Sequence, residues 1–376
     1  MPVYDYIKNG KKHYYFAFEV KMANGKRKTI KKRGFTGRME CKKAEALARA
    51  EWEQGNYFDE SKLTFKEYLQ NWADNKQDWS DQSRYNNINY LRYHIYPHLG
   101  DYKIKDIGLK EIEDYIKTLQ NLESKYNKKL SQGTIKKIFN LVNTAFKDAV
   151  KKEFIKKNPI DLLPEKPRVD KVQMDYWSAA EVKHFLSNFE HRQKIVFILA
   201  IFTGMRLQEI LGLQIKDINL ELGKIYIRNK LDFKVRIKAG AKTTSGIRQI
   251  DISESTIVKE ALRSHIATVQ REKTENKPYY DQDLLVCTAN GNPLSKENCR
   301  AMWYRLLKKT NSRQIRFHDL RHTCASLMFQ TSPPTHPKVV QELLGHSSIK
   351  ITLDKYSHMI PTMHSQAIRG LENLIE

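Results

Sequence analysis

The chain has 376 residues, more than one hydrophobic core usually serves, so two or three domains are expected. Its formal net charge of +23 indicates a polyanionic partner. The four cysteines form no CxxC pair, which argues against a disulfide framework or a zinc cluster. The amino terminus lacks an apolar signal-like stretch, and the longest apolar run, Ile195 to Phe202, is too short to span a bilayer. We therefore expect a cytoplasmic protein with no membrane contact.

An amphipathic β-hairpin is expected within residues 13–35. Aromatic and apolar side chains occupy every second position of its first strand, and Asn24-Gly25 supplies a favoured tight turn before a densely basic return strand. A helix is expected over about 38–52, with Ala44, Leu47 and Ala48 on its packed side.

The first 56 residues are strongly basic. They hold 14 Lys and Arg against 6 Asp and Glu, a surplus of eight positive charges. A solvated strand face would explain this surplus, but a small sheet with one apolar and one cationic face can also dock in a DNA groove. We favour DNA contact for residues 1–56.

Residues 62–160 predict an all-helical domain after a short polar linker. Thr64 and Glu67 form a capping box at the start of its first helix. Asn158-Pro159 and two later prolines indicate a linker to the next domain. The remaining helices are expected at about 82–96, ending at Pro97 and Gly100, at 109–122 and at 132–152.

Residues 172–376 predict a larger mixed domain, mainly α-helical, of α+β type. A second capping box, Ser178 to Glu181, begins it, and a buried helix runs through 195–202. Residues 362–375 have helical apolar spacing, and whether they pack on their own domain or on a neighbouring protomer is left open. Strands are expected near 224–228, 235–238 and 248–252, and helices at about 255–270, 295–309, 317–330, 337–344 and 349–356.

The string FHDLRHT brings chemistry-bearing side chains together. On a helix, His318, Arg321 and His322 share one face. Two histidines four residues apart with an acid between them resemble a zinc helix of the HExxH type, with Asp319 in place of Glu. Histidine beside arginine instead suggests a site for phosphate oxygens.

Four more residues are candidates with ordinary alternatives. Arg206 follows a glycine break and could simply pair with Glu209. Lys242 lies in a turn and could simply be a solvent-exposed residue. His346 follows a glycine, and Tyr356 could be a packing residue at a helix end. Taken singly, each signal is weak.

In this order the candidates resemble the active-site set of the tyrosine recombinases, the phage integrase family. The resemblance covers roughly residues 175–365, including the strings GMRLQEILGL, KTTSGIR, FHDLRHTCASLM and LLGHSSIKITLDKYSH. The helical domain is similar to that family's core-binding, SAM-like domain, and the basic hairpin unit resembles an arm-type DNA-binding domain. The implied active-site residues are Arg206, Lys242, His318, Arg321, His346 and Tyr356.

The resemblance implies a site-specific recombinase that cleaves and rejoins DNA through a 3′-phosphotyrosine on Tyr356. Arg206 and Arg321 would hold the phosphate oxygens, and His318 and His346 would add hydrogen-bond donors. His318 is also a candidate acceptor of the tyrosine proton. Lys242 would protonate the leaving 5′ oxygen. Neither a metal nor ATP is then needed as a cofactor.

The phosphate-site interpretation is favoured over the zinc interpretation, because no third zinc ligand is evident and the cation Arg321 would lie beside the metal. His322 then becomes a packing or supporting residue. Asp319 becomes a helix-start acid that interacts with backbone amides.

The implied role is integration and excision of a phage or mobile element. The expected partners are double-stranded DNA, at core and arm attachment sites, further copies of the chain in a homotetramer on DNA, and accessory bending or excision factors. Two alternatives stay open: a catalytically silent DNA-binding regulator on the same scaffold, and a chromosome-dimer resolvase. An intact residue set argues against the first, and the basic amino-terminal unit argues against the second.

Overall fold

A computed structural model describes residues 3–21, 27–53, 63–122, 129–169, 174–239 and 247–356. The chain divides into two compact units, Met1–Lys171 and Val172–Glu376, and each part is described by itself. In the ranges given above, no helix combines the length and the apolar character that crossing a bilayer requires. The helix expected over 362–375 lies outside the described residues.

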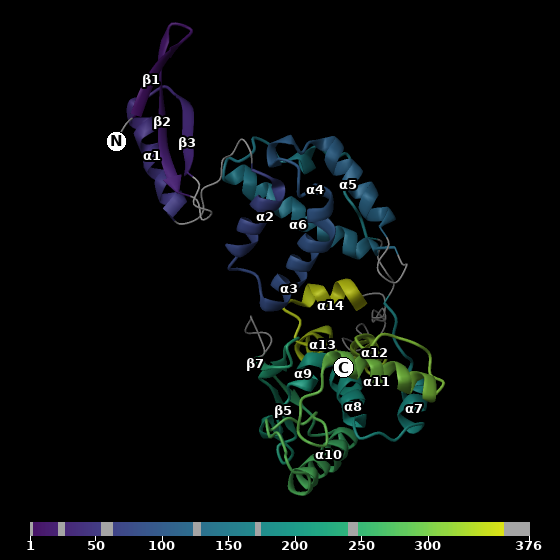
Figure 1. The fold of residues 1–376 in the computed structure, drawn as a ribbon. Helices are drawn as coiled ribbons and strands as arrows, with labels where there is room; N and C mark the ends of the chain where they lie inside the picture. Colours follow the sequence, from purple (N-terminus) through teal and green to yellow (C-terminus); the bar gives the residue numbers. More distant parts are fainter. Residues whose placement is uncertain are drawn as a thin grey trace, which may run out of the picture. The chain divides into compact units, whose positions relative to one another are not determined.

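The amino-terminal domain is a three-stranded antiparallel sheet with one helix (Figure 1). The expected hairpin is present as β2 (Lys11–Lys21) and β3 (Arg27–Phe35), although its turn lies outside the described residues. The sequence analysis missed β1 (Val3–Lys8), which pairs with β2. Because its burial pattern does not alternate strictly, the first strand carries no clean period-two signal.

The helix α1 (Arg38–Glu53) covers the apolar face of this sheet, packing against Phe16, Phe18 and Ile30. Cys41 and Ala48 of this helix are buried in that core. The expectation that Leu47 packs inward is wrong, since its side chain is 64% exposed. Buried Glu45 takes the neighbouring inward position and accepts a hydrogen bond from Arg49.

The opposite face of the sheet carries aromatic and cationic side chains. The rings of Tyr4 and Tyr15 stack with centroids 5.1 Å apart across β1 and β2. From β3, the ammonium of Lys31 lies 4.7 Å and the guanidinium of Arg33 lies 5.3 Å from the centre of the Tyr15 ring. These cation–π contacts hold the positive charges on the open side of the sheet.

The helical domain is built around a single apolar core, which its long helix α6 lines. The Thr64–Glu67 capping box is confirmed at the start of α2. Figure 1 shows α2 to α6 gathered in one bundle. The elements are α2 (Phe65–Asp74), α3 (Asp81–Tyr90), the π-helical turn η1 (Leu91–Ile95), α4 (Tyr96–Leu99), η2 (Ile104–Asp106), α5 (Leu109–Asn121), α6 (Gln132–Lys151) and η3 (Pro159–Leu162).

Two breaks differ from the sequence expectation. Pro97 does not end the second helix, because a π-helical turn precedes it and places it in the first turn of α4, where its missing N–H is not needed. The first part of the expected linker is also packed: Ile160, in η3, and Leu163 are buried in the core of the helical domain.

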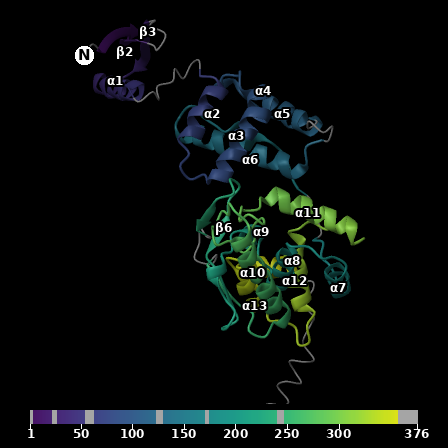
Figure 2. The ribbon, with the colours of Figure 1, turned by 60° about the horizontal axis from the view of Figure 1, so that its bottom comes forward.

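The carboxyl-terminal domain wraps helices around α8 (Lys194–Thr203), which is apolar on every side. Its residues from Ile195 to Ile201 are buried, and it contacts α9, α10 and α12. Figure 2 shows these helices clustered about α8. The Ser178–Glu181 capping box is confirmed at the start of α7.

This domain also holds two small antiparallel sheets, ordered β4-β5-β8 and β6-β7. The strands expected near 224–228, 235–238 and 248–252 correspond to β5, β7 and β8, and the five later helices are all present. The elements are α7 (Ala179–Ser187), α8, α9 (Leu207–Leu211), η4 (Ile215–Asp217), β4 (Ile218–Asn219), β5 (Lys224–Ile227), β6 (Asn229–Leu231), β7 (Ile237–Ala239), β8 (Arg248–Asp251), α10 (Thr256–Glu275), α11 (Lys296–Lys309), α12 (Asp319–Phe329), α13 (Pro337–Leu344) and α14 (Ile349–Tyr356).

An aromatic cluster fixes the start of α12. Trp303 from α11 lies between Trp177 and Phe317, at centroid distances of 5.3 and 5.9 Å. The backbone N–H of Trp177 donates to the hydroxyl of Thr323 in α12. The helix that begins just after Phe317 is therefore anchored on its buried side, and the string HDLRH has a fixed orientation.

Candidate active site

The first turn of α12 is locked by Asp319. Its carboxylate is buried and accepts the backbone N–H of Arg316 at 2.8 Å and the guanidinium of the same residue, also at 2.8 Å. The expectation that Asp319 is a helix-start acid bound to a backbone amide is confirmed. His318 precedes it and keeps an exposed edge, while Arg321 is buried.

Arg321 has only 3% of its surface exposed. Its guanidinium donates to the carbonyl oxygen of Gly204 at 2.7 Å and to that of Leu344 at 2.5 Å. These two bonds join the end of α8, the first half of α12 and the end of α13.

Arg206 lies at the start of α9 with its side chain 40% exposed. It pairs with Glu209, Nη1 to Oε1, at 2.8 Å, which is the ordinary alternative considered for this residue. However, its Nη2 also donates to the carbonyl oxygen of Gly345 at 3.2 Å. The guanidinium is thus held at the end of α13, as that of Arg321 is.

A third arginine, Arg248 in β8, was given no role in the sequence analysis. Its Nε donates to the carbonyl oxygen of Leu343 at 2.8 Å, and its two Nη atoms bind both oxygens of Glu209 at 2.8 and 3.2 Å. The Arg248 side chain is 7% exposed and that of Glu209 is 9% exposed. The two residues form a buried, bidentate ion pair.

Three successive carbonyl groups at the end of α13 therefore each receive a different arginine. Those of Leu343, Leu344 and Gly345 accept from Arg248, Arg321 and Arg206 respectively. The last carbonyls of a helix have no intrahelical partner, and the helix dipole makes this end negative. The end of α13 therefore gathers the three cations, and we call this set the arginine cluster.

Two glycines allow this approach. Gly204 has φ +61° and Gly345 has φ +64°, a left-handed conformation that a side chain would strain. A Cβ on Gly204 would lie 2.5 Å from Leu344, and one on Gly345 would lie 3.0 Å from the guanidinium of Arg248. Both turns present their carbonyl oxygen to an arginine.

The arginine cluster keeps a positive excess. Burial would raise the pKa of Glu209, but the hydrogen bonds and charge of Arg248, with the charge of Arg206, lower that pKa to about 2. Glu209 is therefore ionised at neutral pH and balances one of the three arginines. The two charges left over suit a dianionic or phosphate-like ligand.

His346 follows Gly345 and is buried. Its Nδ1 lies 2.9 Å from the hydroxyl of Thr352 in α14, which is fully buried. Its backbone is held by Gln341, whose side-chain amide donates to the His346 carbonyl at 2.7 Å. If the hydroxyl donates to Nδ1, the proton of neutral His346 is on Nε2, and that nitrogen is a donor.

Tyr356 ends the described part of α14, and its side chain is 1% exposed. Its hydroxyl lies 2.5 Å from Nδ1 of His322 in α12. Burial raises the pKa of this hydroxyl, while the charge of Arg321 opposes the rise. His322 is therefore more than a packing residue, because it is bonded directly to the tyrosine oxygen.

The three histidines are neutral at physiological pH. Desolvation by the surrounding protein, then the charge of Arg321, lowers the pKa of His318 to about 4 and that of His346 to about 3. Burial, then the neighbouring His318, lowers the pKa of His322 to about 4. Each ring therefore offers one donor and one acceptor.

The structure brings five of the six expected residues into one cluster formed by α9, α12, α13 and α14 of the carboxyl-terminal domain. These are Arg206, His318, Arg321, His346 and Tyr356. Lys242 lies outside the described residues, between β7 and β8.

Four contributing residues were not assigned to the site from sequence. Arg248 lies in the string KTTSGIR and Glu209 lies in GMRLQEILGL, both of which resemble family motifs. The sequence alone, however, does not show that these two residues contact each other. Thr352 contacts His346, and His322 contacts Tyr356. Each contact links different structural segments, so sequence spacing does not reveal it.

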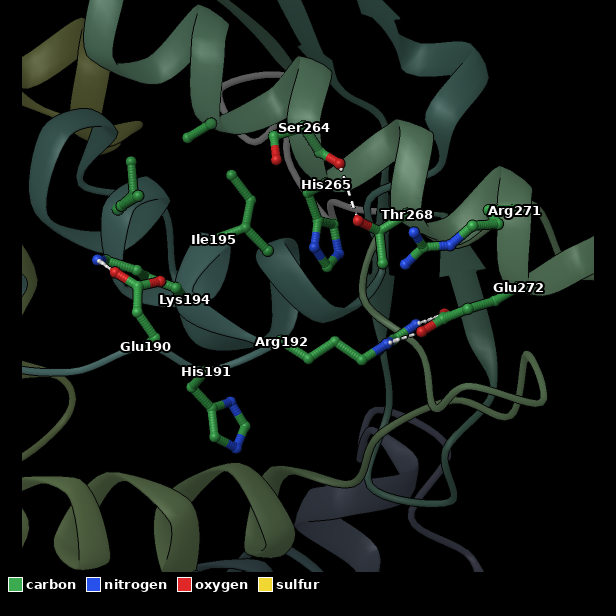
Figure 3. A pocket seen from close by; sticks show the side chains of 12 residues that line it. Glu190, His191, Arg192, Lys194, Ile195, Ser264, His265, Thr268, Arg271 and Glu272 are labelled. Carbon is green, nitrogen blue, oxygen red and sulfur yellow. Dashed lines mark hydrogen bonds and ion pairs between the residues drawn. The ribbon is translucent and has the colours of Figure 1, made fainter.

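A separate polar cavity of about 510 Å³ lies between the start of α8 and α10 (Figure 3). Arg192 points across it to Glu272, with Nε to Oε1 at 2.7 Å, and Gln193 beside it donates to the carbonyl of Cys287. The ion pair of Arg192 with Glu272 neutralises that arginine and tethers α10 to the chain before α8, so this cavity is a poor second candidate.

Family comparisons agree with this arrangement. Residues 176–362 match the phage integrase family, residues 64–120 a phage integrase N-terminal SAM-like domain, and residues 2–51 an arm DNA-binding domain. A tyrosine recombinase XerC-like protein of Caldanaerobacter subterraneus subsp. tengcongensis is 30% identical over 285 residues, 69% of this chain and 71% of that protein. The ICEBs1 integrase of Bacillus subtilis is 26% identical over 349 residues, 90% of each chain.

Solved structures show the same fold. The Tn1549 transposon integrase in complex with a circular intermediate DNA has a TM-score of 0.67 at 22% identity, covering 83% of this chain and 99% of that one. The lambda integrase tetramer bound to a Holliday junction has a TM-score of 0.59 at 18% identity, covering 96% and 95%. The expected fold class is confirmed.

These matches define a tyrosine-type site-specific DNA recombinase. The chain belongs to the phage integrase family.

Proposed function

We propose that this recombinase integrates and excises a phage or integrative element, and that Tyr356 is its nucleophile. The observation that carries the proposal is the placement of one tyrosine hydroxyl among buried histidines and an arginine cluster with surplus positive charge. A phosphodiester under attack develops negative charge on its non-bridging oxygens, which this cluster suits.

Arg206 and Arg321 are proposed to bind the scissile phosphate. Each guanidinium has five N–H donors, and the carbonyl and carboxylate bonds described above occupy two on each. The remaining donors suit phosphate oxygens, and the carbonyl bonds keep the planes of the two groups fixed beforehand. His318 and His346 would add neutral donors.

Substituting Tyr356 by Phe tests the nucleophile. Only an oxygen is removed, so DNA affinity should change little while strand cleavage disappears. The measurement is covalent-complex formation on a nicked duplex that carries the core site. Sequencing the junction between the element and the chromosome identifies that core site. Proteolysis and mass spectrometry of the wild-type complex should place the DNA on the peptide containing Tyr356.

Tyr304 offers a matched control, since it is a half-exposed tyrosine on α11 of the same domain. Tyr304→Phe should cleave at the wild-type rate. DNA attached to any other residue, or cleavage by Tyr356→Phe, would overturn the assignment and leave a DNA-binding regulator as the better function.

Lys242 is proposed as the general acid that protonates the leaving 5′ oxygen. Lys242→Ala should slow cleavage of ordinary DNA by on the order of 10² to 10⁴, the usual range for this kind of catalysis. In a substrate with sulfur at the 5′ bridging position, the 5′ thiolate leaves without needing a proton. Lys242→Ala should therefore recover much of the cleavage rate on that substrate. If the sulfur substrate brings no recovery, Lys242 binds phosphate or supports the fold instead.

We further propose a division of labour among three domains: arm-site binding by residues 1–56, core-site binding by 62–160 and catalysis by 172–376. The open sheet face with Tyr15, Lys31 and Arg33 supports the first. The proposed assembly is a homotetramer on DNA in the bacterial cytoplasm, with accessory bending or excision factors. The lambda integrase tetramer on a Holliday junction supports the tetramer by analogy.

The comparisons favour an integrase over a chromosome-dimer resolvase. The similarity to the ICEBs1 integrase spans 90% of this chain, whereas the similarity to the XerC-like protein spans 69%. Residues 2–51 also match an arm DNA-binding domain.

A further inference from the structure

We propose that His322, and not His318, accepts the proton of Tyr356 during strand cleavage. This inference rests on the proposed function, since it takes Tyr356 as the nucleophile. His322 touches the reacting oxygen, so its role would be catalytic.

The contact geometry is specific. Nδ1 of His322 lies 2.5 Å from the hydroxyl oxygen of Tyr356, a short contact that places the hydroxyl within hydrogen-bond reach of the ring nitrogen. In the described part of the chain the Tyr356 hydroxyl is bonded to His322, whereas His318 meets the His322 ring edge-on, with centroids 5.2 Å apart. A base must be within hydrogen-bond reach of the proton that it removes, and His322 meets this condition.

Both residues are held in place. His322 is buried on α12, whose first turn is locked by Asp319, and Tyr356 packs against Phe329 of the same helix with ring centroids 5.9 Å apart. The two rings are thus fixed by one helix and its packing partner α14.

The surroundings keep His322 neutral. On α12 it faces His318, Asp319 and Arg321, and from α14 it faces Lys355 and Tyr356. His346 also lies within electrostatic range. Burial is the main reason that the pKa of His322 is lowered, and the cations Lys355 and Arg321 outweigh the single carboxylate of Asp319, so the unprotonated ring is available to accept a proton at neutral pH.

Cleavage moves one proton onto His322 and rejoining returns it. As the Tyr356 oxygen forms a bond to phosphorus, its O–H bond breaks and the proton passes to Nδ1 of His322, whose Nε2 already carries one. The bond from phosphorus to the 5′ oxygen breaks, and that oxygen takes a proton from the general acid. On rejoining, the 5′ hydroxyl attacks phosphorus and gives its proton back to that acid. The bond from phosphorus to the tyrosine oxygen then breaks, and the imidazolium of His322 returns its proton to that oxygen.

The test compares His322→Asn with the matched variant His318→Asn, each carrying either tyrosine or a fluorinated, more acidic tyrosine at position 356. Asparagine can keep a hydrogen-bonding atom near the place of Nδ1 but cannot act as the base. Single-turnover covalent-complex formation on the nicked core-site duplex is the readout. With ordinary tyrosine, His322→Asn should lose on the order of 10²-fold, and the more acidic phenol should recover about tenfold or more of that loss.

A loss that is equal for both tyrosines would overturn the proposal, because a supporting role is indifferent to phenol acidity. Recovery in His318→Asn but not in His322→Asn would assign the base to His318 and overturn it as well. If Tyr356→Phe itself still cleaves, the proposed function fails first, and this outcome is distinct from the other two.

A measurement on the unsubstituted histidine guards against misfolding of the variant. With ¹⁵N-labelled histidine, one Nδ1 resonance of the wild-type protein should report an unprotonated, hydrogen-bonded nitrogen and should shift in Tyr356→Phe. The absence of any histidine shift between the two proteins would contradict the proposed contact in solution.

Discussion

Neutral histidines beside a cationic cluster depend on their partners for orientation. His346 is the clearest case, because its Nδ1 meets the buried hydroxyl of Thr352, and when that hydroxyl donates, Nε2 of His346 is the donor. A ring that rotates freely would present the wrong nitrogen to the phosphate for part of the time. We therefore propose that Thr352 orients His346 for the proposed reaction.

Thr352→Val tests this role at nearly constant side-chain volume. The hydrogen bond that it removes contributes about 1 kcal/mol, so the cleavage rate should fall by roughly five- to tenfold with DNA affinity unchanged. Single-turnover cleavage at saturating protein is the measurement. Thr323→Val, which removes a buried hydroxyl of α12 that supports Trp177, is the comparison for a purely structural loss.

That comparison separates orientation from folding. Thr323→Val should lower the unfolding free energy more than it lowers the cleavage rate, and Thr352→Val should do the reverse. A Thr352→Val protein that cleaves at the wild-type rate would show that the hydroxyl does not orient the ring.

At the residue scale, the six expected site residues came from strings that resemble a family. The contacts among the site residues could not be read from sequence. His322 and Tyr356 are 34 positions apart, and Arg248 and Glu209 are 39 apart, so only the tertiary fold brings them together.

At the scale of elements, the end of α13 organises the arginine cluster. Its last carbonyl groups bind Arg248, Arg321 and Arg206, and Glu209 bridges two of these. Arg248 is the structural member, since it is buried and committed to Glu209 and Leu343.

Arg248→Met should destabilise the domain by about 3 kcal/mol, because it leaves a buried carboxylate with less compensation. The folded pKa of Glu209 lies near 2, below its ordinary 4.5, so the wild-type stabilisation is present above pH 4.5 and is lost as the pH falls toward 2. The difference between Arg248→Met and wild type should therefore shrink over that window. Urea denaturation at pH 7 and at pH 3 measures it.

Lys224→Met is the matched control, because Lys224 in the adjacent strand β5 pairs with the exposed Asp251. That exposed pair should contribute less than about 1 kcal/mol. Equal effects of the two substitutions would show that Glu209 does not depend on Arg248.

Elements with a capping box were predictable from sequence, as at Thr64 and Ser178, because the cap chemistry is local. The errors have causes beyond the local pattern. Pro97 is accommodated by the preceding π-helical turn, and Leu47 faces solvent because buried Glu45 and Ala48 take the positions against the sheet.

At the scale of the whole molecule, positive charge is distributed over several domains, in line with a protein that holds DNA at more than one place. Deleting residues 1–56 should abolish integration while sparing cleavage of core-site DNA. Binding of the intact chain to arm DNA should weaken steeply with salt, because phosphate contacts release counterions. Integration in cells and core cleavage in solution are the two measurements.

Point variants refine that test without removing a domain. Lys31→Ala with Arg33→Ala alters the open sheet face, whereas Lys43→Ala alters an exposed position on α1. The double variant should weaken arm-site binding and reduce the salt slope by about one for each phosphate that is no longer bound, and Lys43→Ala should do neither. Integration by the truncated chain at the full rate would refute the arm-binding role.

The burial of Tyr356 has a consequence for a protein that searches a chromosome. Nearly all DNA that the protein meets has the wrong sequence, and a permanently presented nucleophile would nick it. The hydroxyl of Tyr356, the proposed nucleophile, is buried and bonded to His322, so the described structure does not present it to a passing phosphate. The contact that we propose activates the tyrosine would therefore also limit cleavage of nonspecific DNA during the search.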